Sequence, residues 1–298
     1  MITKAMFLKY MDEIDQELLR GDLKLHQRPM HAFTCLTEKV DKSGTYKMNS
    51  GENIDREDFS NDALCAQVHW WYEERYGDRI KIHPGPGSYV IVIRGEPWEV
   101  VFPLCFGQNN FTIDADLARV KRKVDVGGGR MIPEINILSH VTSMTQHLAS
   151  SLSYEEKSAI LHDYMFGLNV VQSLKDSYYQ PFMELAANDY DLSVFNIFQK
   201  YPDYNNSKWS SLQFSEKVMK SKLCQLGATI KRTHDLKSLA KTLSEYDVNI
   251  SDSLIERVQC SPSVRYGETK VTKHEAIEAI KCSLAIYQQV FNASSYEF

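Results

Sequence analysis

The sequence predicts an α+β protein. We expect a helix-rich N-terminal domain with a small antiparallel β-sheet at residues 1–203, followed by a bundle of four helices at 207–298. Apolar residues recur at helical spacing along much of the chain, whereas residues 88–104 are rich in β-branched and aromatic side chains. The stretch 201–207 (YPDYNNS) gathers Pro, Asp and Asn between periodic segments. That composition is typical of a linker, so the domain boundary is expected there.

Five segments of the N-terminal part show the apolar spacing of an amphipathic helix. They are residues 1–20, 62–76, 133–150, 154–175 and 183–200. Gly21 and Gly77 follow the first two segments, where a glycine favours the end of a helix. Pro133 opens the third segment, and proline suits the first turn of a helix. The polar stretch 44–61 is predicted to be a loop.

A β-hairpin is predicted from Ser88–Arg94 (SYVIVIR) and Trp98–Leu104 (WEVVFPL). Gly95 and Glu96 separate the two arms, and a glycine in the first position suits a two-residue type II′ turn. Nearly every residue of both arms is apolar, so we expect helices to cover both faces. Residues 80–83 are a candidate third strand.

The C-terminal part contains two longer and two shorter helical patterns. The segment 209–226 ends before Gly227, which favours a left-handed helix end, and Thr233 is the expected N-cap of a helix running to 243. A short helix is predicted at 252–258. Thr272 with Glu275 three residues later predicts a capping box for the last helix.

Two segments of this region resemble the HEPN family. The first is Thr233-His234-Asp235-Leu236 at the start of a helix, and the second is 260–285, where Arg265-Tyr266 precedes the last helix. The resemblance implies a four-helix bundle that forms a homodimer. It also implies a prokaryotic nucleotide-linked or RNA-cleaving role, in a stress or phage-defence system.

The charge of the chain is unevenly distributed. The formal net charge is −5, yet residues 207–298 hold 13 basic and 10 acidic side chains, and 207–241 hold eight and two. Such a local excess favours contact with phosphates, so Lys217, Lys220, Lys231 and Arg232 are candidate phosphate or nucleic-acid ligands. The alternative interpretation is an ordinary solvated helix face.

Composition excludes several classes of protein. Hydrophobic residues make up 43% and charged residues 24% of the chain, as in ordinary globular proteins. No run of 18 apolar residues exists and the first residues include acids, so we expect no membrane segment and a cytoplasmic location. The six cysteines form no CxxC pair, which indicates reduced thiols and no zinc site. We predict neither a metal nor a cofactor.

Catalytic candidates come from the family resemblance. Active HEPN ribonucleases carry an Arg followed by four to six residues and then a His, which implies a guanidinium that holds phosphate and an imidazole that moves a proton. The nearest match is Arg265 with His274, but eight residues intervene. His234, beside Lys231 and Arg232, is a second candidate. The structural alternatives are packing of the Arg265-Tyr266 loop and packing of His234 between helices.

Other motifs favour structural roles. Asp114 and Asp116 would share one side of a strand, as in a magnesium-binding nucleotidyltransferase, but the surrounding residues depart from that pattern and turn or capping roles are favoured. Gly127-Gly128-Gly129-Arg130 lacks the Lys-Ser/Thr of a P-loop, so a hinge is favoured. The adjacent Trp70 and Trp71 are expected in the core.

Three functions remain open on the sequence alone. The first is a noncatalytic module that binds RNA or a nucleotide and dimerises through the bundle. The second is a metal-independent HEPN endoribonuclease. The third is a structural partner-binding protein, which would show an exposed apolar patch in the N-terminal domain and no basic cleft.

Overall fold

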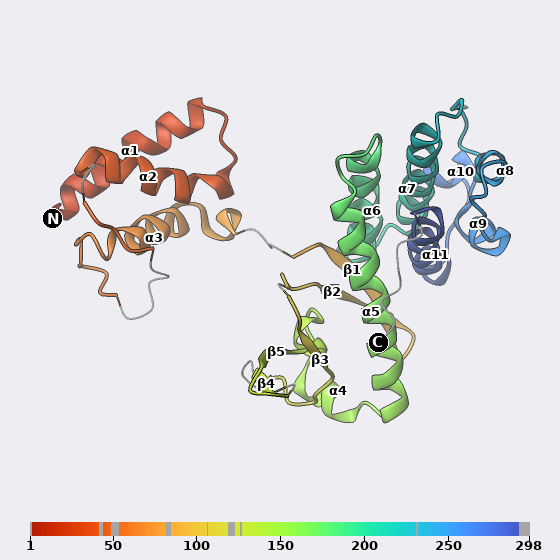
Figure 1. The fold of residues 1–298 in the computed structure, drawn as a ribbon, viewed down its shortest axis with the longest axis horizontal. Helices are drawn as coiled ribbons and strands as arrows, with labels where there is room; N and C mark the ends of the chain where they lie inside the picture. The colour runs from red at the N-terminus through yellow and green to blue at the C-terminus, as the bar shows by residue number, and fades with distance from the viewer. Residues whose placement is uncertain are drawn as a thin grey trace. The chain divides into compact units, whose positions relative to one another are not determined.

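The computed structural model describes residues 2–41, 44–48, 54–81, 85–105, 107–118, 123–125, 127–230 and 232–291. Contacts divide the chain into two compact units, Met1–His83 and Pro84–Phe298. Helices and small sheets are both present, which confirms the α+β class (Figure 1). The stretch 201–207, where the sequence predicts a boundary, lies inside the second unit, and its last four residues are the first turn of a helix.

Three α-helices make up most of the first unit in the residues that the structure describes. They are α1 (Lys4–Arg20), α2 (Arg28–Val40) and α3 (Leu64–Tyr76), with short 3₁₀ turns at Leu25–Gln27 and Gly77–Ile80. Their apolar faces meet around Met11, Leu36 and Tyr72, which are fully buried. The helices expected at 1–20 and 62–76 are confirmed, whereas α2 was not predicted.

A buried ion pair joins α1 to α2 inside this unit. The Asp15 carboxylate lies 3.5 Å from the Arg28 guanidinium, and it also accepts a hydrogen bond from the Tyr76 hydroxyl. A buried carboxylate needs such partners to offset the loss of its hydration. Trp71 packs against the core as expected. Trp70 instead contacts Arg56, whose Cζ lies 4.8 Å from the centroid of the Trp70 ring.

The second unit begins with the predicted hairpin. Strands β1 (Ser88–Ile93) and β2 (Glu96–Val101) pair antiparallel, with Ile93 opposite Glu96. The turn residues are therefore Arg94 and Gly95, at φ 52° and 81°. Positive φ at both positions is typical of a type I′ turn, so the predicted Gly95-Glu96 type II′ turn is wrong by one residue. In the region expected as a third strand, Ile80 lies in a 3₁₀ turn, and residues 82 and 83 are outside the described part.

A second small sheet follows the hairpin. Strand β5 (Met131–Asn136) lies between β3 (Asn110–Thr112), which is parallel to it, and β4 (Lys123–Asp125), which is antiparallel. The helix predicted at 133–150 is therefore wrong: this stretch holds most of β5, a 3₁₀ turn at Ile137–His140 and the short helix α4 (Gln146–Ser151).

Pro133 is compatible with β5 because the two neighbouring strands pair with different parts of it. Pro133 faces Lys123 on the β4 side, whereas β3 pairs only with Glu134–Asn136. The missing N–H of Pro133 therefore does not interrupt a ladder on both sides.

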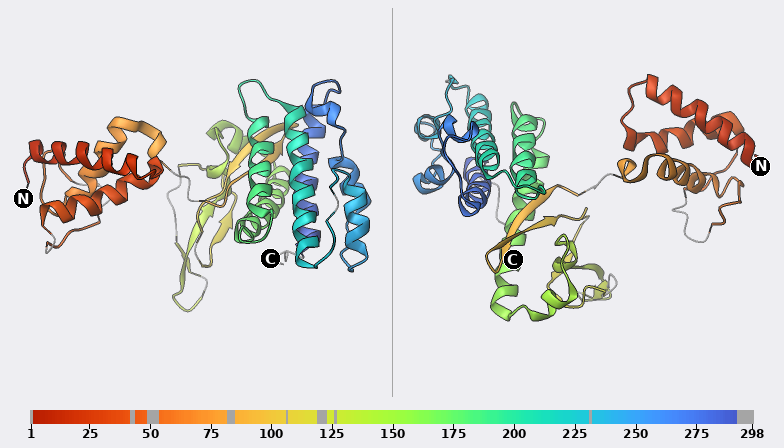
Figure 2. Two further views of the ribbon diagram at one scale, coloured as in Figure 1. Left: turned by 90° about the horizontal axis from the view of Figure 1, so that it is seen from above. Right: turned by 180° about the vertical axis from the view of Figure 1, so that it is seen from behind.

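Four long helices pack together in the described part of this unit. They are α5 (Tyr154–Asp176), α6 (Met183–Ile197), α7 (Tyr204–Gln225) and α11 (Lys273–Phe291). Figure 2 shows α7 (teal) beside α6 (green) and α11 (dark blue), and both neighbours pack against it. Buried serines line α7 where its neighbours approach, and the Ser207 hydroxyl donates to the Ser193 carbonyl of α6 at 2.8 Å. The C-terminal helical bundle is thus confirmed.

Polar contacts tie α5 and the hairpin to this bundle. The Tyr89 hydroxyl of β1 donates to Asp163 of α5 at 2.7 Å, and the same carboxylate is paired with Lys281 of α11. The Tyr190 hydroxyl of α6 donates to the Ser88 carbonyl at 2.7 Å. The hairpin is therefore packed against the helices through β1, whereas most of β2 is half-buried, so the predicted cover of both faces is only partly present.

Three short helices lie between α7 and α11. They are α8 (Leu236–Ser244), α9 (Asp252–Val258) and α10 (Pro262–Arg265). Gly227 follows α7 at φ 69°, as the predicted helix end requires. Asp235, rather than Thr233, is the N-cap of α8, because its side chain accepts the Lys237 N–H.

The predicted capping box of α11 is present. Glu275 accepts from the Thr272 N–H at 2.8 Å, and the Glu275 N–H donates to the Thr272 hydroxyl at 3.2 Å. Both bonds satisfy N–H groups that the first turn of a helix leaves without partners.

All six cysteines are free thiols. None of the helices in the described part of the chain combines the length and the apolar character that a membrane crossing requires.

Candidate functional site

His234 lies in the loop between α7 and α8, where it is held by contacts from both sides. Its Nδ1 is 2.6 Å from Oε2 of Glu216 on α7. The Gln259 side chain fixes the backbone, because its amide donates to the His234 carbonyl at 3.3 Å and its oxygen accepts the Leu236 N–H at 2.9 Å. The imidazole is therefore positioned by residues from two helical segments.

Glu216 is a buried carboxylate with three polar partners. Its side chain is 7% exposed. Oε1 accepts from Lys220 Nζ at 2.6 Å, while Oε2 faces His234 Nδ1 and the more distant Gln213 amide at 3.4 Å. Since the carboxylate accepts, His234 carries its hydrogen on Nδ1. The His234 side chain is 62% exposed, so Nε2 is left as the imidazole nitrogen for an outside ligand.

The Trp209 indole joins His234 to Arg265. The Trp209 and His234 ring centroids lie 6.0 Å apart, and Arg265 Cζ lies 5.8 Å from the Trp209 ring centroid. Arg265 is the last residue of α10, which is anchored to α7 by the Asn205 amide through bonds to the Val264 and Thr269 carbonyls, at 2.8 and 2.7 Å. One aromatic ring of α7 therefore has a cation and an imidazole beside it.

A hollow of about 390 Å³ opens beside this ring. Its lining is mostly polar and comes from α6, α7 and α10: Asp189, Leu192, Asn196, Asn206, Trp209, Ser210, Gln213 and Arg265. An indole stacks on planar bases, a guanidinium pairs with phosphate, and amides both donate and accept hydrogen bonds. Burial raises the pKa of the Asp189 carboxyl, and the Lys217 ammonium opposes that shift.

The predicted phosphate ligands have varied surroundings. Lys217 is paired with Asp189, and Lys220 with Glu216, so both cations already have acidic partners. Arg232 is exposed, and Lys231 lies outside the described residues. The local charge excess of 207–241 is therefore partly balanced by Asp189, a residue outside that stretch.

The structure places Arg265 and His234 beside the same Trp209 ring, whereas His274 has other partners. The His274 side chain is 80% exposed, and its Nδ1 lies 3.7 Å from Glu278 Oε2, a carboxylate also paired with Arg257. Arg265 instead lies against Trp209. Arg265 and His274, which are separated by eight residues in the sequence, therefore contact different partners.

Sequence reasoning missed Trp209 and Glu216 as site residues. The helical spacing of Trp209 predicted only a packing role, and no local pattern links Glu216 to a histidine 18 positions later. The one available signal was that Glu216 is an acidic residue in a stretch with eight basic ones.

No group of three or more potential metal ligands (His, Cys, Asp or Glu) occurs among the residues that the structure describes. Asp114 and Asp116 follow β3, and their carboxylates accept the Asp116 and Ala118 N–H groups at 3.0 and 3.1 Å. These are the turn contacts that the sequence favours. Gly127–Arg130 lies between β4 and β5 as a turn closed by the Arg130 N–H on the Gly127 carbonyl.

Comparison with known proteins supports the family assignment for part of the chain. Neither the curated proteins nor the solved structures contain a match to it. A family model, described as the HEPN domain, matches residues 182–292, which run from the start of α6 to the end of α11. The C-terminal third of this chain is therefore a HEPN domain.

Proposed function

We propose that this HEPN domain binds RNA or a nucleotide in the hollow beside Trp209, without cleaving it. The supporting observation is that Arg265 and His234 both lie against the Trp209 indole, each within 6.0 Å. A base stacks on the indole, and Arg265, with the exposed Arg232 two residues before His234, contacts the phosphates. In this proposal the protein acts in a prokaryotic stress or phage-defence system, the setting that the resemblance implies.

Stacking and charge make separable contributions to such binding. Stacking of one base on an aromatic side chain contributes about 1–3 kcal/mol and depends little on salt. Phosphate contacts release counterions, so their contribution falls as salt rises. A W209L change therefore lowers affinity at every salt concentration, whereas R265Q lowers both affinity and its salt dependence.

Fluorescence anisotropy with a labelled single-stranded RNA tests the proposal. We expect W209L to weaken binding by about tenfold or more, in line with the loss of one stacking contact. H274A is the matched control, because His274 contacts Glu278 rather than Trp209. Binding that is absent in the wild type, insensitive to salt, or unchanged in both W209L and R265Q contradicts the proposal.

We further propose that the domain forms a homodimer through its helical bundle. A dimer places two copies of the Trp209 hollow in one assembly, which lets a longer RNA contact both. Multi-angle light scattering of the purified chain measures its mass directly. A monomeric mass across micromolar concentrations contradicts the dimer. The W209L experiment still tests the binding site, because it does not depend on the oligomeric state.

A metal-independent endoribonuclease is the second candidate, favoured by the Glu216–His234 pair. Glu216 orients the ring through Nδ1, so Nε2 takes the proton of an RNA 2′-hydroxyl. The 2′-oxygen then attacks the phosphorus, and the bond to the 5′-oxygen breaks. The 5′-oxygen takes a proton from a water molecule and leaves as a hydroxyl, and the resulting hydroxide takes the proton held by His234. Arg265 balances the charge on the phosphoryl oxygens.

Cleavage of labelled RNA in the presence of EDTA separates the two candidates. We expect any such cleavage to be abolished in H234A and kept in H274A. E216Q is expected to lower the rate by about a hundredfold without loss of RNA binding, as orienting partners of histidine do. Cleavage that persists in the H234A/H274A double variant excludes this chemistry.

A further inference from the structure

Helix α6 carries a stripe of large apolar side chains that face solvent. Leu185, Leu192 and Phe195 are 55%, 49% and 57% exposed, and Phe182, the residue just before the helix, is 40% exposed. Leu185 and Leu192 are seven residues apart, and Phe195 follows three residues later, so all three lie on one helical face. Contiguous apolar surface of this kind is typical of interaction sites rather than of free protein surface.

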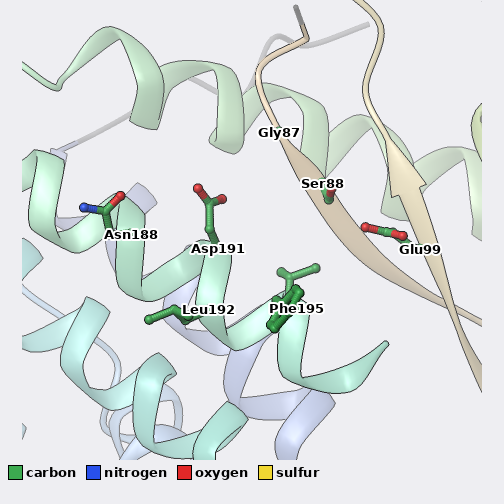
Figure 3. Close-up of a pocket in the computed structure, with 8 residues that line it drawn as sticks. Gly87, Ser88, Glu99, Asn188, Asp191, Leu192 and Phe195 are labelled. Atoms are coloured by element: carbon green, nitrogen blue, oxygen red, sulfur yellow. The ribbon is translucent and has the colours of Figure 1, made fainter. Parts of the chain in front are cut away.

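The stripe leads into a hollow of about 660 Å³ between α6 and the hairpin. Leu192, Val194 and Phe195 form its apolar wall. Figure 3 shows the Asp191 carboxylate above α6 and the Glu99 carboxylate reaching in from β2 on the opposite side. Partial desolvation at the mouth of the hollow raises the pKa of Asp191, which is exposed by surface area, and the Lys175 ammonium opposes the shift.

Neither of these carboxylates has an ion-pair partner within the described part of the chain. Lys175, the cation that influences Asp191, donates its hydrogen bond to the Gly85 carbonyl instead. An unpaired carboxylate beside apolar surface favours a ligand that supplies a positive charge.

The helix itself adds to the negative charge. The segment 183–197 contains Glu184, Asp189 and Asp191 and no Lys, Arg or His. Glu184, Asn188 and Asp191 are exposed on the same side as the apolar stripe. The surface is therefore apolar along its centre and acidic along one margin.

We propose that α6 binds an amphipathic helix of a partner protein, whose apolar face covers the stripe and whose lysine or arginine enters the hollow between Asp191 and Glu99. Residues 182–195 span about 20 Å along the helix axis, so the partner helix needs about four turns to cover them. The stripe extends beyond the hollow to Leu185 and Phe182. A small molecule bound in the hollow would leave these two side chains exposed, so a helix fits the surface better.

A second copy of this chain fits the surface poorly. In a symmetric dimer, an interface on α6 brings the same patch from both copies together. The acidic margin of α6 then meets the same helix of the other copy, which offers no Lys, Arg or His to pair with Glu184 or Asp191. The surface shares Leu192 with the hollow beside Trp209 but uses neither Arg265 nor His234, so R265Q, which is expected to weaken RNA binding, is expected to leave peptide binding unchanged.

The test uses three fluorescein-labelled peptides of about 18 residues, a length that forms roughly five helical turns. The first places leucines on one helical face and lysines along one margin. The second replaces the lysines by glutamates, and the third has the composition of the first in scrambled order. Anisotropy is measured with the full 298-residue chain. We expect the lysine peptide alone to bind.

Two variants locate the contact. L185S/L192S is expected to weaken the lysine peptide by about tenfold or more, as loss of central apolar contacts does. D191K is expected to weaken the lysine peptide and to allow the glutamate peptide to bind. Y154S is the matched control, because Tyr154 is 82% exposed on a different helix. Circular dichroism of each variant checks that the fold is kept.

Three outcomes overturn the proposal. The first is equal binding of the lysine and glutamate peptides to the wild type. The second is unchanged binding in L185S/L192S and D191K. The third is that the wild type forms a dimer and binds no peptide, while L185S/L192S is a monomer. That result would assign the stripe to contact with a second copy of the chain.

Discussion

Glu216 illustrates how the role of a single residue depends on its partners. In the sequence it is one of two acids in a basic stretch, whereas in the structure it is buried and hydrogen-bonded to Lys220 and His234. Burial makes an unpaired carboxylate costly, so the contacts with Lys220 and His234 offset the burial of the Glu216 side chain. The candidate site is therefore a property of the contact and not of either residue alone.

The cysteines provide a residue-scale prediction. Burial raises the pKa of Cys260 to about 11, with Lys208 opposing the shift, whereas Cys224 is exposed. At pH 8 only about a thousandth of Cys260 is thiolate, the form that reacts. We expect iodoacetamide at pH 8 to modify Cys224 well before Cys260, as measured by mass spectrometry of peptides.

Raising the pH toward 11 is expected to speed the modification of Cys260. In guanidinium chloride all six cysteines should react, which confirms that the folded environment is responsible. Equal rates at Cys224 and Cys260 in the folded protein contradict the assigned burial.

At the scale of elements, local signals placed most helices and missed segments that depend on partners. Gly77 and Gly227 end their helices with positive φ, and Thr272 with Glu275 begins another. By contrast, Pro133 suits the first turn of a helix as well as it suits β5, and only pairing with β3 and β4 decides between them. Local propensity is decisive at caps because the partner atoms lie within the same few residues.

Gly167 in α5 gives a prediction in which two effects oppose each other. A Cβ at this position would lie 2.5 Å from the Tyr89 ring, which is fully buried. Alanine favours a helix over glycine by about 1 kcal/mol, while overpacking a core costs about 1–3 kcal/mol. We expect the clash to dominate, so that G167A lowers the free energy of unfolding in urea by about 1 kcal/mol or more.

The matched control is G21A. Gly21 has φ −77°, and an added Cβ would meet nothing closer than 3.6 Å. Its free energy of unfolding is expected to change by no more than about 0.5 kcal/mol. A stabilising effect of G167A would show that Tyr89 does not pack against this turn.

The start of α5 gives a prediction about pH. Hydrogen bonds from Arg94, and then from the Ser153 N–H, lower the pKa of Glu156 from 4.5 to about 2. A carboxyl with a lowered pKa binds fewer protons in the folded state, so its stabilisation is present above about pH 4.5 and is lost as the pH falls toward 2. We expect the melting temperature of E156Q to lie below that of the wild type at pH 7 and to converge with it below pH 4.5.

The glutamine of E156Q can still accept the capping hydrogen bond, so the comparison isolates the charge. E184Q serves as the control, because the Glu184 carboxylate has no ion pair in the described residues and the difference from the wild type should be small at each pH. A melting-temperature gap for E156Q that persists unchanged to pH 2 contradicts the assigned pKa.

At the scale of the whole molecule, the HEPN match covers less than the compact unit that contains it. The family model begins at residue 182, yet α5 and the β1–β2 hairpin also contact α6 and α11. Tyr190 of α6 binds the Ser88 carbonyl, and Ser173 of α5 lies 3.1 Å from the Tyr287 hydroxyl of α11. These contacts make the hairpin and α5 part of the folded environment of the HEPN helices.

Fragments of the chain test this organisation. We expect residues 84–298 to unfold in one cooperative thermal transition, because they retain the contacts of the second unit. Residues 207–298 lack α5 and α6, and so expose Phe214, whose ring lies 5.7 Å from Tyr190 in the intact chain. This shorter fragment is expected to lack a cooperative transition by circular dichroism. A sharp melt of 207–298 would favour the boundary that the sequence predicts at 201–207.

The sequence alone determined the features that depend on nearby residues. Helical spacing and caps located α1, α3, α5, α6, α7 and α11, and β-branched residues around a glycine located the hairpin. The motif from Thr233 to Leu236, with Arg265-Tyr266, led to the HEPN family, which the family model matches. Such signals arise because hydrogen bonds and side-chain contacts within a helix or a turn join residues only a few positions apart.

Tertiary structure decided what these elements do together. It placed Arg265 and His234 beside Trp209, paired Glu216 with His234, and left Leu192 and Phe195 of α6 exposed. The first two arrangements depend on contacts between residues far apart in the sequence. The exposure of Leu192 and Phe195 depends on which other segments pack over α6. A local sequence pattern contains neither kind of information. The physical reason is that burial and charge pairing are set by what surrounds a side chain after folding.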